Sequence, residues 1–302
     1  MSTILVAGLT NIETTLRVDG FPIAYEPTRY PFNGISSTVA GVGYNISKAL
    51  TALGDSVRFL TLIGRDASYP MVLEALARDA LAREYVLPLV AETAKSIIAY
   101  DADGRRAIFV DLKDIQERRY PAEQFETALR GSALAVLCNI NFTRPLLERA
   151  RRAGVPVATD VHTIASLDDP YNRDYLAAAD ILFMSDERLP APPETWARRV
   201  LDRFGPAVVV IGMGAQGALL AVRDDNFIER VPAVSVRPVV STIGAGDALF
   251  SAFVHAYVSA GDPYSAIRQA VAFAAHKIGA TGAADGFLDA AALSALCRQL
   301  YG

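Results

Sequence analysis

The chain has 302 residues, 52% of them hydrophobic and 21% charged, and a net charge of −4. This length and composition indicate a packed globular protein, which we expect to form one α/β domain over residues 1–302. The acidic balance and the lack of a basic run argue against nucleic acid as a partner.

The N-terminal segment and the cysteines point to the cytoplasm. The opening MSTILVAGLTN has no basic residues before its short apolar run, so it does not resemble a signal peptide. No stretch is long and apolar enough to span a bilayer, which argues against a membrane partner. Cys138 and Cys297 lack the spacing of a disulfide framework or a zinc site, as expected for reduced thiols.

Apolar runs typical of buried parallel strands alternate with helical patterns along most of the chain. The expected strands are 3–8, 57–64, 133–140, 155–160, 180–185 and 207–212. The expected helices are 44–53, 69–83, 122–130, 144–153 and 194–204, followed by 246–260, 263–278 and 288–300. This alternation predicts a doubly wound α/β/α sandwich with right-handed crossovers.

Two segments, about 12–38 and 95–111, break the alternation. They carry strand-like patterns around the turn signals Asn33-Gly34 and Asp103-Gly104. We therefore expect a small second sheet, which could act as a lid over a site or as the edge of an oligomer. Four aromatic residues of the first segment could cover a nucleobase or, as we favour, pack between two lids: Phe21, Tyr25, Tyr30 and Phe32.

The stretch STIGAGDALFSAF places small residues and a carboxylate at the start of a helix. Gly244, Ala245 and Gly246 leave the backbone accessible, and the first N–H groups of a helix form an anion site. Asp247 follows in the first turn, where it could serve as a base toward a hydroxyl beside the anion. The alternative is a carboxylate that only complements the helix dipole.

Three other stretches could contribute to the same site. In AGVGYNISKALTALG, Gly41 and Gly43 precede a helix with Asn45 in its first turn, which suits polyol recognition or a plain strand-to-helix connection. Asn11 and Glu13 follow the first strand and are two residues apart, so their side chains could point to the same side. They lie at the edge where open α/β sheets bind ligands. The turn GMGAQG, with Gly212, Gly214 and Gly217, could pass a nucleotide or be an ordinary hairpin.

Together these stretches resemble the ribokinase-like, or PfkB-type, carbohydrate and nucleoside kinases over essentially the whole chain. The family's N-terminal signature is matched from Ala40-Gly41 to Leu53-Gly54, with Ala40 in place of a glycine. Its C-terminal signature D-T-x-G-A-G-D is matched by STIGAGD, with Ser241 in place of the first Asp.

The resemblance implies a ribokinase-like fold with a β-lid and assigns roles to these residues. Asp247 matches the catalytic base, and Gly244, Ala245 and Gly246 match the anion hole. The substrate-binding positions it implies are Asn11, Glu13, Gly41, Gly43 and Asn45. The ATP-binding positions it implies are Gly212, Gly214, Gly217, Thr242 and His276, although for His276 we favour the alternative of an ordinary histidine on a helix face.

Departures from the family pattern concern the metal ions. Where relatives show N-x-x-E for Mg²⁺ and phosphate, this chain has the run from Ser185 to Arg188, so Asp186 or Glu187 would take the Mg²⁺ role. Ser241 removes a carboxylate near the anion hole and could alter the dependence on a monovalent cation such as K⁺.

We therefore expect an ATP-dependent kinase that phosphorylates a primary hydroxyl of a small sugar or related polyol. A nucleoside kinase of the same fold is the alternative, and a non-catalytic sugar- or nucleoside-binding protein is a further one. The lid could also form a homodimer.

Overall fold

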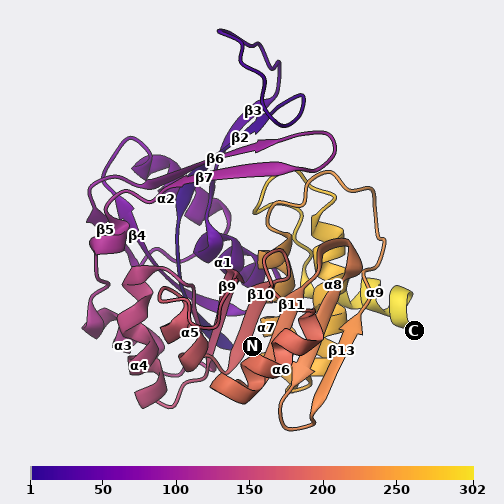
Figure 1. Cartoon of the computed structure of the whole chain (residues 1–302). Coiled ribbons are helices and arrows are strands. Elements are labelled where there is room, and N and C mark those ends of the chain that lie inside the picture. The colour runs from indigo at the N-terminus through magenta and orange to yellow at the C-terminus, as the bar shows by residue number, and fades with distance from the viewer. Residues whose placement is uncertain (1) are drawn as a thin grey trace.

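The computed structural model describes residues 2–302, which form a nine-stranded sheet and a four-stranded sheet (Figure 1). The large sheet has the strand order β13-β12-β11-β10-β9-β8-β1-β4-β5. Its strands are β1 (Thr3–Ala7), β4 (Ser56–Gly64), β5 (Val86–Val90), β8 (Leu134–Leu137), β9 (Val157–Thr163), β10 (Ile181–Ser185), β11 (Val208–Gly212), β12 (Ala218–Val222) and β13 (Phe227–Val231). The pairs β11–β12 and β12–β13 are antiparallel, and the remaining pairs are parallel.

Helices cover both faces of the large sheet, because successive side chains of each strand point to opposite sides. In β1, Ile4 and Val6 belong to one core cluster, whereas Leu5 and Ala7 belong to the other. The first cluster is closed by α1 (Val42–Ala52), α2 (Tyr69–Arg78), α7 (Ala245–Ala260), α8 (Pro263–Lys277) and α9 (Ala290–Tyr301). The second is closed by α3 (Ala122–Leu129), α4 (Arg144–Arg152), α5 (Arg173–Ala178) and α6 (Pro193–Phe204). The predicted α/β/α sandwich is confirmed.

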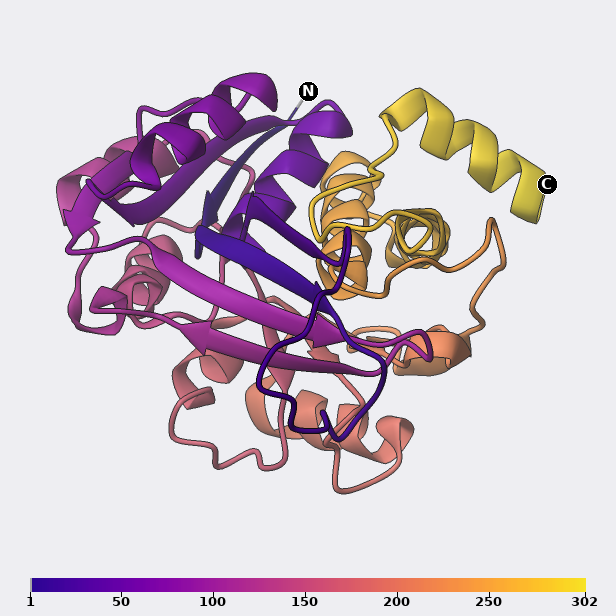
Figure 2. The same ribbon diagram turned by 90° about the horizontal axis from the view of Figure 1, so that it is seen from above.

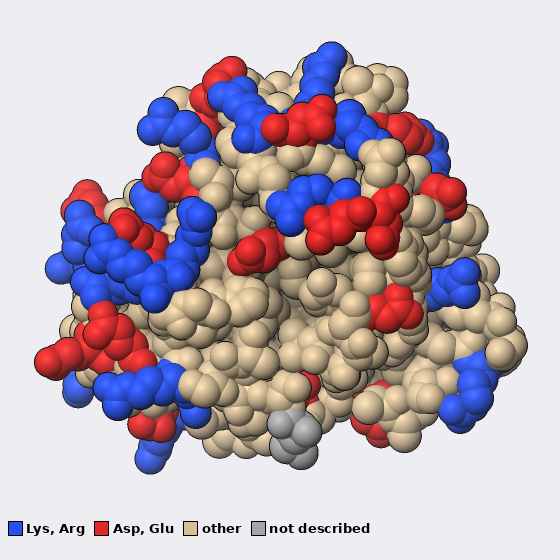
Figure 3. All heavy atoms as spheres, turned by 90° about the horizontal axis from the view of Figure 1, so that it is seen from below, with Lys and Arg blue, Asp and Glu red and all other residues tan. Residues whose placement is uncertain are grey.

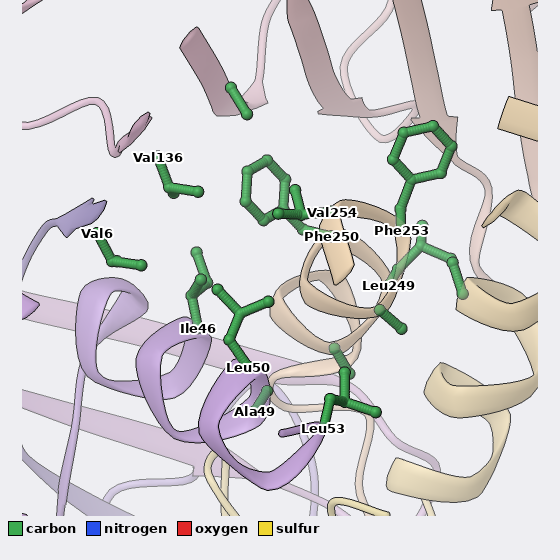
Figure 4. Close-up of a cluster of buried hydrophobic side chains, with 14 of the residues drawn as sticks. Val6, Ile46, Ala49, Leu50, Leu53, Val136, Leu249, Phe250, Phe253 and Val254 are labelled. Carbon is green, nitrogen blue, oxygen red and sulfur yellow. The ribbon is translucent and has the colours of Figure 1, made fainter. Parts of the chain in front are cut away.

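Helices α1 and α7 pack against each other beneath the site. Ile46 and Leu50 of α1 lie beside Phe250 and Val254 of α7, with Val6 and Val136 of the sheet completing the contact (Figure 4). All of these side chains are buried. This apolar contact fixes the spacing between the first turns of the two helices.

The small sheet lies across one end of the large sheet (Figures 1 and 2). It has the order β3-β2-β6-β7, with β2 (Asn11–Arg17), β3 (Ile35–Ala40), β6 (Ala94–Tyr100) and β7 (Arg106–Asp111). Only residues 8–10 separate β1 in the large sheet from β2 in the small one. The turn expected at Asp103-Gly104 joins β6 to β7, with Gly104 at a φ of 80°.

The segment between β2 and β3 differs from the sequence pattern. Residues 18–34 contain no strand and project away from the body (Figure 1). Tyr25 is 91% exposed and Phe32 is 80% exposed, so neither ring covers the interior. These two rings therefore lie on a loop and not on the face of a sheet, and the packing between two lids expected for them stays a prediction.

The opposite end of the molecule has a mixed surface. Acidic and basic side chains of that face are interspersed around its edge, and its middle is mostly uncharged (Figure 3). No helix among residues 2–302 combines the length and apolarity needed to cross a membrane.

We expect Phe183→Ala to lower the free energy of unfolding by about 3–5 kcal/mol, because it leaves a cavity in the core. The Phe183 ring contacts Phe250 and Phe253 at centroid distances of 4.8 and 5.3 Å. Urea denaturation measures the change. Val239→Ala is the control, since Val239 is 62% exposed, and it should shift the free energy by less than about 0.5 kcal/mol. Equal losses in the two variants would contradict this account of the core.

Candidate active site

The first turn of α7 presents free backbone donors. Gly244 is the N-cap at a φ of 76°, and a Cβ there would lie 2.3 Å from the Ala283 carbonyl oxygen, so only glycine fits. No side chain of residues 2–302 caps the helix. Its early amides, including those of Gly246 and Asp247, therefore have no intrahelical acceptor. Together with the helix dipole, these amides form a place for an anion.

The first turn of α1 meets that of α7 through one hydrogen bond. Asn45 Nδ2 donates to Asp247 Oδ2 at 2.7 Å, joining residues 202 positions apart. Gly43 is needed for close packing, because a Cβ there would lie 2.5 Å from the backbone carbon of Gly8. At Gly41 a Cβ would lie 2.6 Å from the Leu9 carbonyl oxygen. Both glycines thus bring Asn45 close to the end of β1.

The small sheet contributes two buried polar side chains. Asn11 and Glu13 lie two residues apart on β2, so they share a face, and both are buried. Asn11 Nδ2 donates to Ser96 Oγ at 2.8 Å on the neighbouring strand β6. Three buried acceptor oxygens have no donor among the described residues: Asn11 Oδ1, Glu13 Oε1 and Asn45 Oδ1. Such atoms are costly unless a ligand or water donates to them.

Burial raises the pKa values of both carboxyl groups in this region. Burial raises the pKa of Asp247 to about 6, against the hydrogen bond from Asn45, which lowers it. Burial, reinforced by the charge of Asp247, raises the pKa of Glu13 to about 7. Each carboxyl group therefore has a pKa close to neutral pH, where it can both bind and release a proton. This property suits a group that exchanges a proton with a ligand.

The small sheet is attached to the loop that precedes α7. Ala40 and Ile98 form a buried cluster with Ile243 and Ala283. Arg106 of β7 adds a polar connection, since its Nη1 donates to Thr242 Oγ1 at 2.9 Å. Sequence analysis did not single out Arg106, because an arginine beside a hairpin turn looks like an ordinary exposed residue.

Arg106 also contacts one of the two acids expected to bind a metal. Its Nη2 lies 3.3 Å from Glu187 Oε1. Asp186 is next to Glu187 after β10, and burial raises its pKa. No group of three or more His, Cys, Asp or Glu side chains suited to holding a metal occurs within residues 2–302.

The glycine turn 212–217 is a hairpin between the antiparallel strands β11 and β12. Gly217 is required for packing, because a Cβ there would lie 2.1 Å from the Val231 carbonyl oxygen, whereas Gly214 faces open space. Residue His276 is half-buried near the end of α8, and burial lowers its pKa. No hydrogen bond among the described residues joins it to the 212–217 turn, whereas Asn45 and Asp247 are in direct contact.

A second residue that sequence analysis missed is Lys277, the last residue of α8. Its side chain is fully buried, and its Nζ donates to the carbonyl oxygen of Ile243, directly before Gly244. Burial lowers its pKa to about 8, while the charges of Asp247, Asp285 and Glu13 raise it. The available signal was a lysine within an otherwise apolar helical pattern.

Comparison with known proteins places this chain in a family. Residues 1–290 match the family described as pfkB family carbohydrate kinase. The acarbose 7(IV)-phosphotransferase of Actinoplanes sp. is 28% identical over 295 residues, 96% of each protein. A microbiome-derived acarbose kinase superimposes with a TM-score of 0.87 at 24% identity, covering 98% of this chain and 99% of the other. Arabidopsis thaliana ribokinase, solved with ribose and ATP, gives 0.82 at 20% identity, covering 99% of both. The predicted resemblance and fold are confirmed.

The raised pKa of Asp247 has a consequence for stability that can be measured without a ligand. Because the folded pKa lies above the unfolded one, the ionised carboxylate destabilises the fold above about pH 6. Asp247→Asn removes that charge, so it should raise the free energy of unfolding at pH 8 by about 1–2 kcal/mol. The gain should shrink as the pH falls toward 4, where both proteins are neutral at this position.

Urea denaturation at pH 8 and pH 5 tests this, with the exposed Asp202→Asn on α6 as the matched control. A stability difference that is independent of pH would rule out the electrostatic explanation.

Proposed function

The chain belongs to the pfkB family of carbohydrate kinases, and we propose that it transfers the γ-phosphoryl group of ATP to a primary hydroxyl of a small sugar or related polyol. It is a phosphotransferase with a sugar acceptor. One observation carries the finer assignment: a carboxylate at an uncapped helix start adjoins three buried acceptor oxygens that have no donors. Hydroxyl groups of a polyol are the donors such oxygens require.

In this proposal Asp247 is the base. Its carboxylate accepts the proton of the attacking hydroxyl as the oxygen approaches phosphorus. A pKa of about 6 leaves it mostly ionised at neutral pH yet more basic than an exposed aspartate. The hydrogen bond from Asn45 holds one carboxylate oxygen and leaves the other for the substrate.

The residues Gly244, Ala245 and Gly246 would stabilise the transferring group. The Ala245 amide donates to the Thr242 carbonyl oxygen at 3.2 Å, so the Gly244 and Gly246 amides are the ones that would face the space before α7. Negative charge accumulates there on the phosphoryl oxygens in the transition state. Because these donors are held by the helix, they need no rearrangement as the charge develops. The small sheet, attached through Ile243 and Arg106, would exclude water that otherwise competes as acceptor.

The acceptor hydroxyls would be bound by Asn11, Glu13 and Asn45. Each presents an unpartnered oxygen, and the Asn11 amide is oriented by Ser96. The glycines Gly41 and Gly43 would act by bringing α1 close to the end of β1. Tyr25 and Phe32 lie on the exposed loop, so they do not form an aromatic surface that would cover a nucleobase, as the nucleoside alternative would require.

A larger sugar is a second candidate acceptor. A pocket of about 340 Å³ adjoins the site beside β3, α1 and α2, and Lys48 and Asp285 are among its lining residues. Asp285 contributes its charge to both Glu13 and Lys277, so it borders the pocket and the candidate site. A second ring attached to the phosphorylated one would fit this space, as the likeness to an acarbose phosphotransferase supports.

The nucleotide would lie along the 212–217 turn, with Thr242 and His276 nearby. Mg²⁺ is commonly held by one or two carboxylates together with substrate phosphates, and it neutralises phosphate charge when bound. Asp186 and Glu187 after β10 fit that donor set. Glu187 is oriented by Arg106, and a bound cation would favour the ionised form of Asp186.

A homodimer through the small sheet is a further part of the proposal. The sheet's edge strand β7 exposes apolar side chains, with Ile108, Phe109 and Val110 all about half exposed or more. A second copy packed on this strand would bury them.

Asp247→Asn should lower kcat roughly 10³-fold or more, because the base and its partners act as a unit. The affinity for ATP should change little, since the nucleotide lies on the other side of the transferred group. Steady-state kinetics together with calorimetric ATP titration measure the two effects. Asp202→Asn is the control with unchanged kcat, and near-normal turnover by Asp247→Asn would overturn the mechanism.

A panel of sugars, sugar acids and nucleosides should identify the acceptor class by thermal shift. Ligands that bind only the folded state raise Tm by mass action, and a non-hydrolysable ATP analogue should enlarge the shift. Sugars and their oligomers should stabilise the protein more than nucleosides. The reverse ranking, followed by phosphorylation of a nucleoside, would favour the nucleoside kinase.

A further inference from the structure

Lys277 is the only basic side chain among the described residues that is fully buried. Within residues 2–302 no carboxylate lies within ion-pair distance of its ammonium, whose direct partner is the Ile243 carbonyl oxygen. The nearest negative charges are the more distant Asp247, Glu13 and Asp285. A cation without a paired carboxylate is costly to bury, so its position calls for a functional explanation.

The ammonium fixes the peptide unit that leads into α7. In a trans peptide the C=O and N–H point in opposite directions. With the Ile243 carbonyl turned toward Lys277, the Gly244 N–H faces away from the ammonium. Two more contacts hold the same loop to α8, since the amides of Val240 and Ser241 both donate to the Ile278 carbonyl oxygen at 2.8 and 3.0 Å.

The same loop does not fit a bound K⁺. A monovalent cation needs several oxygen ligands, and this chain has Ser241 where the family pattern has a carboxylate. The Ser241 hydroxyl oxygen already accepts a hydrogen bond from the Ile243 amide at 3.3 Å. The Ile243 carbonyl oxygen already accepts one from the Lys277 ammonium. The ammonium also places a positive charge at this loop, which would repel a second cation.

We propose that the Lys277 ammonium is a tethered monovalent cation that positions the loop before the phosphate-binding turn, so that the kinase needs no K⁺. The inference rests on the proposed function for its kinetic meaning but concerns a different residue and property. Lys277 is a positioning residue, because it contacts the loop and acts on the phosphoryl group through the Gly244–Gly246 amides. Its charge also offsets part of the negative charge of Asp247 and Glu13.

The test compares KCl, NaCl and tetramethylammonium chloride at equal ionic strength, so that general screening is constant. The wild-type kcat should vary by less than about twofold among the salts, because the tethered ammonium leaves no site at which a cation from solution could bind. Saturable activation of the wild type by K⁺ would overturn the proposal.

Two substitutions separate charge from packing. Lys277→Ala leaves a space, so its kcat should fall roughly tenfold or more in tetramethylammonium chloride and recover in KCl or NH₄Cl. Lys277→Met fills the space without a charge, so it should lose activity that no salt restores. A purely structural role predicts the opposite order, with Met the better replacement, and full activity of Lys277→Met in every salt would refute the proposal. Lys95→Ala, at an exposed lysine on β6, is the control.

A thermal measurement keeps the test independent of catalysis. K⁺ should raise the Tm of Lys277→Ala above its value in tetramethylammonium chloride, and should not do so for the wild type or Lys277→Met. If no acceptor is phosphorylated while this pattern holds, the proposed function fails and the Lys277 inference stands. If the wild type shows the K⁺-specific shift, the Lys277 inference fails whatever the acceptor.

Discussion

The hydrogen bond between Asn45 and Asp247 joins the starts of two helices that are 202 residues apart in sequence. It can form only because α1 and α7 are held at a fixed spacing by apolar side chains, with Leu50 and Phe250 among them. The close approach of Gly43 to Gly8 then sets how near α1 comes to β1. The geometry of the polar site is therefore determined by the packing of the core beneath it.

Around that bond the protein keeps charges and polar atoms that do not favour folding. Two carboxyl groups with raised pKa values and one lysine with a lowered pKa share a small region, and several acceptor oxygens have no donor. Each of these groups lowers stability, and a core would be more stable without them. In the proposed function, the hydrogen-bond donors of a bound polyol and the charge of a phosphoryl group would complete this arrangement. The burial of the two apolar clusters offsets its cost to folding.

The sequence was sufficient for six strands of the large sheet and for its main helices, because strands buried on both faces are continuous apolar runs that few other structures produce. It was not sufficient for the strands β5, β12 and β13 or for the helix α5, which are short and lack a distinct period. The glycines were correctly placed at helix starts, but sequence alone could not show that Gly43 and Gly217 are required by backbone packing. The roles of Asn11, Asn45 and Asp247 remain predictions, although the structure brings Asn45 and Asp247 into contact.

The residues that sequence analysis missed share one property. Arg106 and Lys277 act through contacts with a loop that is more than thirty residues away in the chain, and no local pattern reports such a contact. Whether a lysine is buried depends on which face of its helix packs against the core. Because most faces of α8 are apolar, its sequence does not show which face that is. Long-range partners of this kind become visible only when the tertiary structure is known.

Several short connections join the small sheet to the body of the protein beside the candidate site. Residues 8–10 lead into β2, Gly41 joins β3 to α1, and residues 91–93 lead into β6. Asn11 and Glu13 lie on β2 just beyond the first of these connections. The orientation of the small sheet therefore sets where these two side chains lie relative to Asp247, so a substitution far out along β2 would alter the candidate site without changing a residue that lines it.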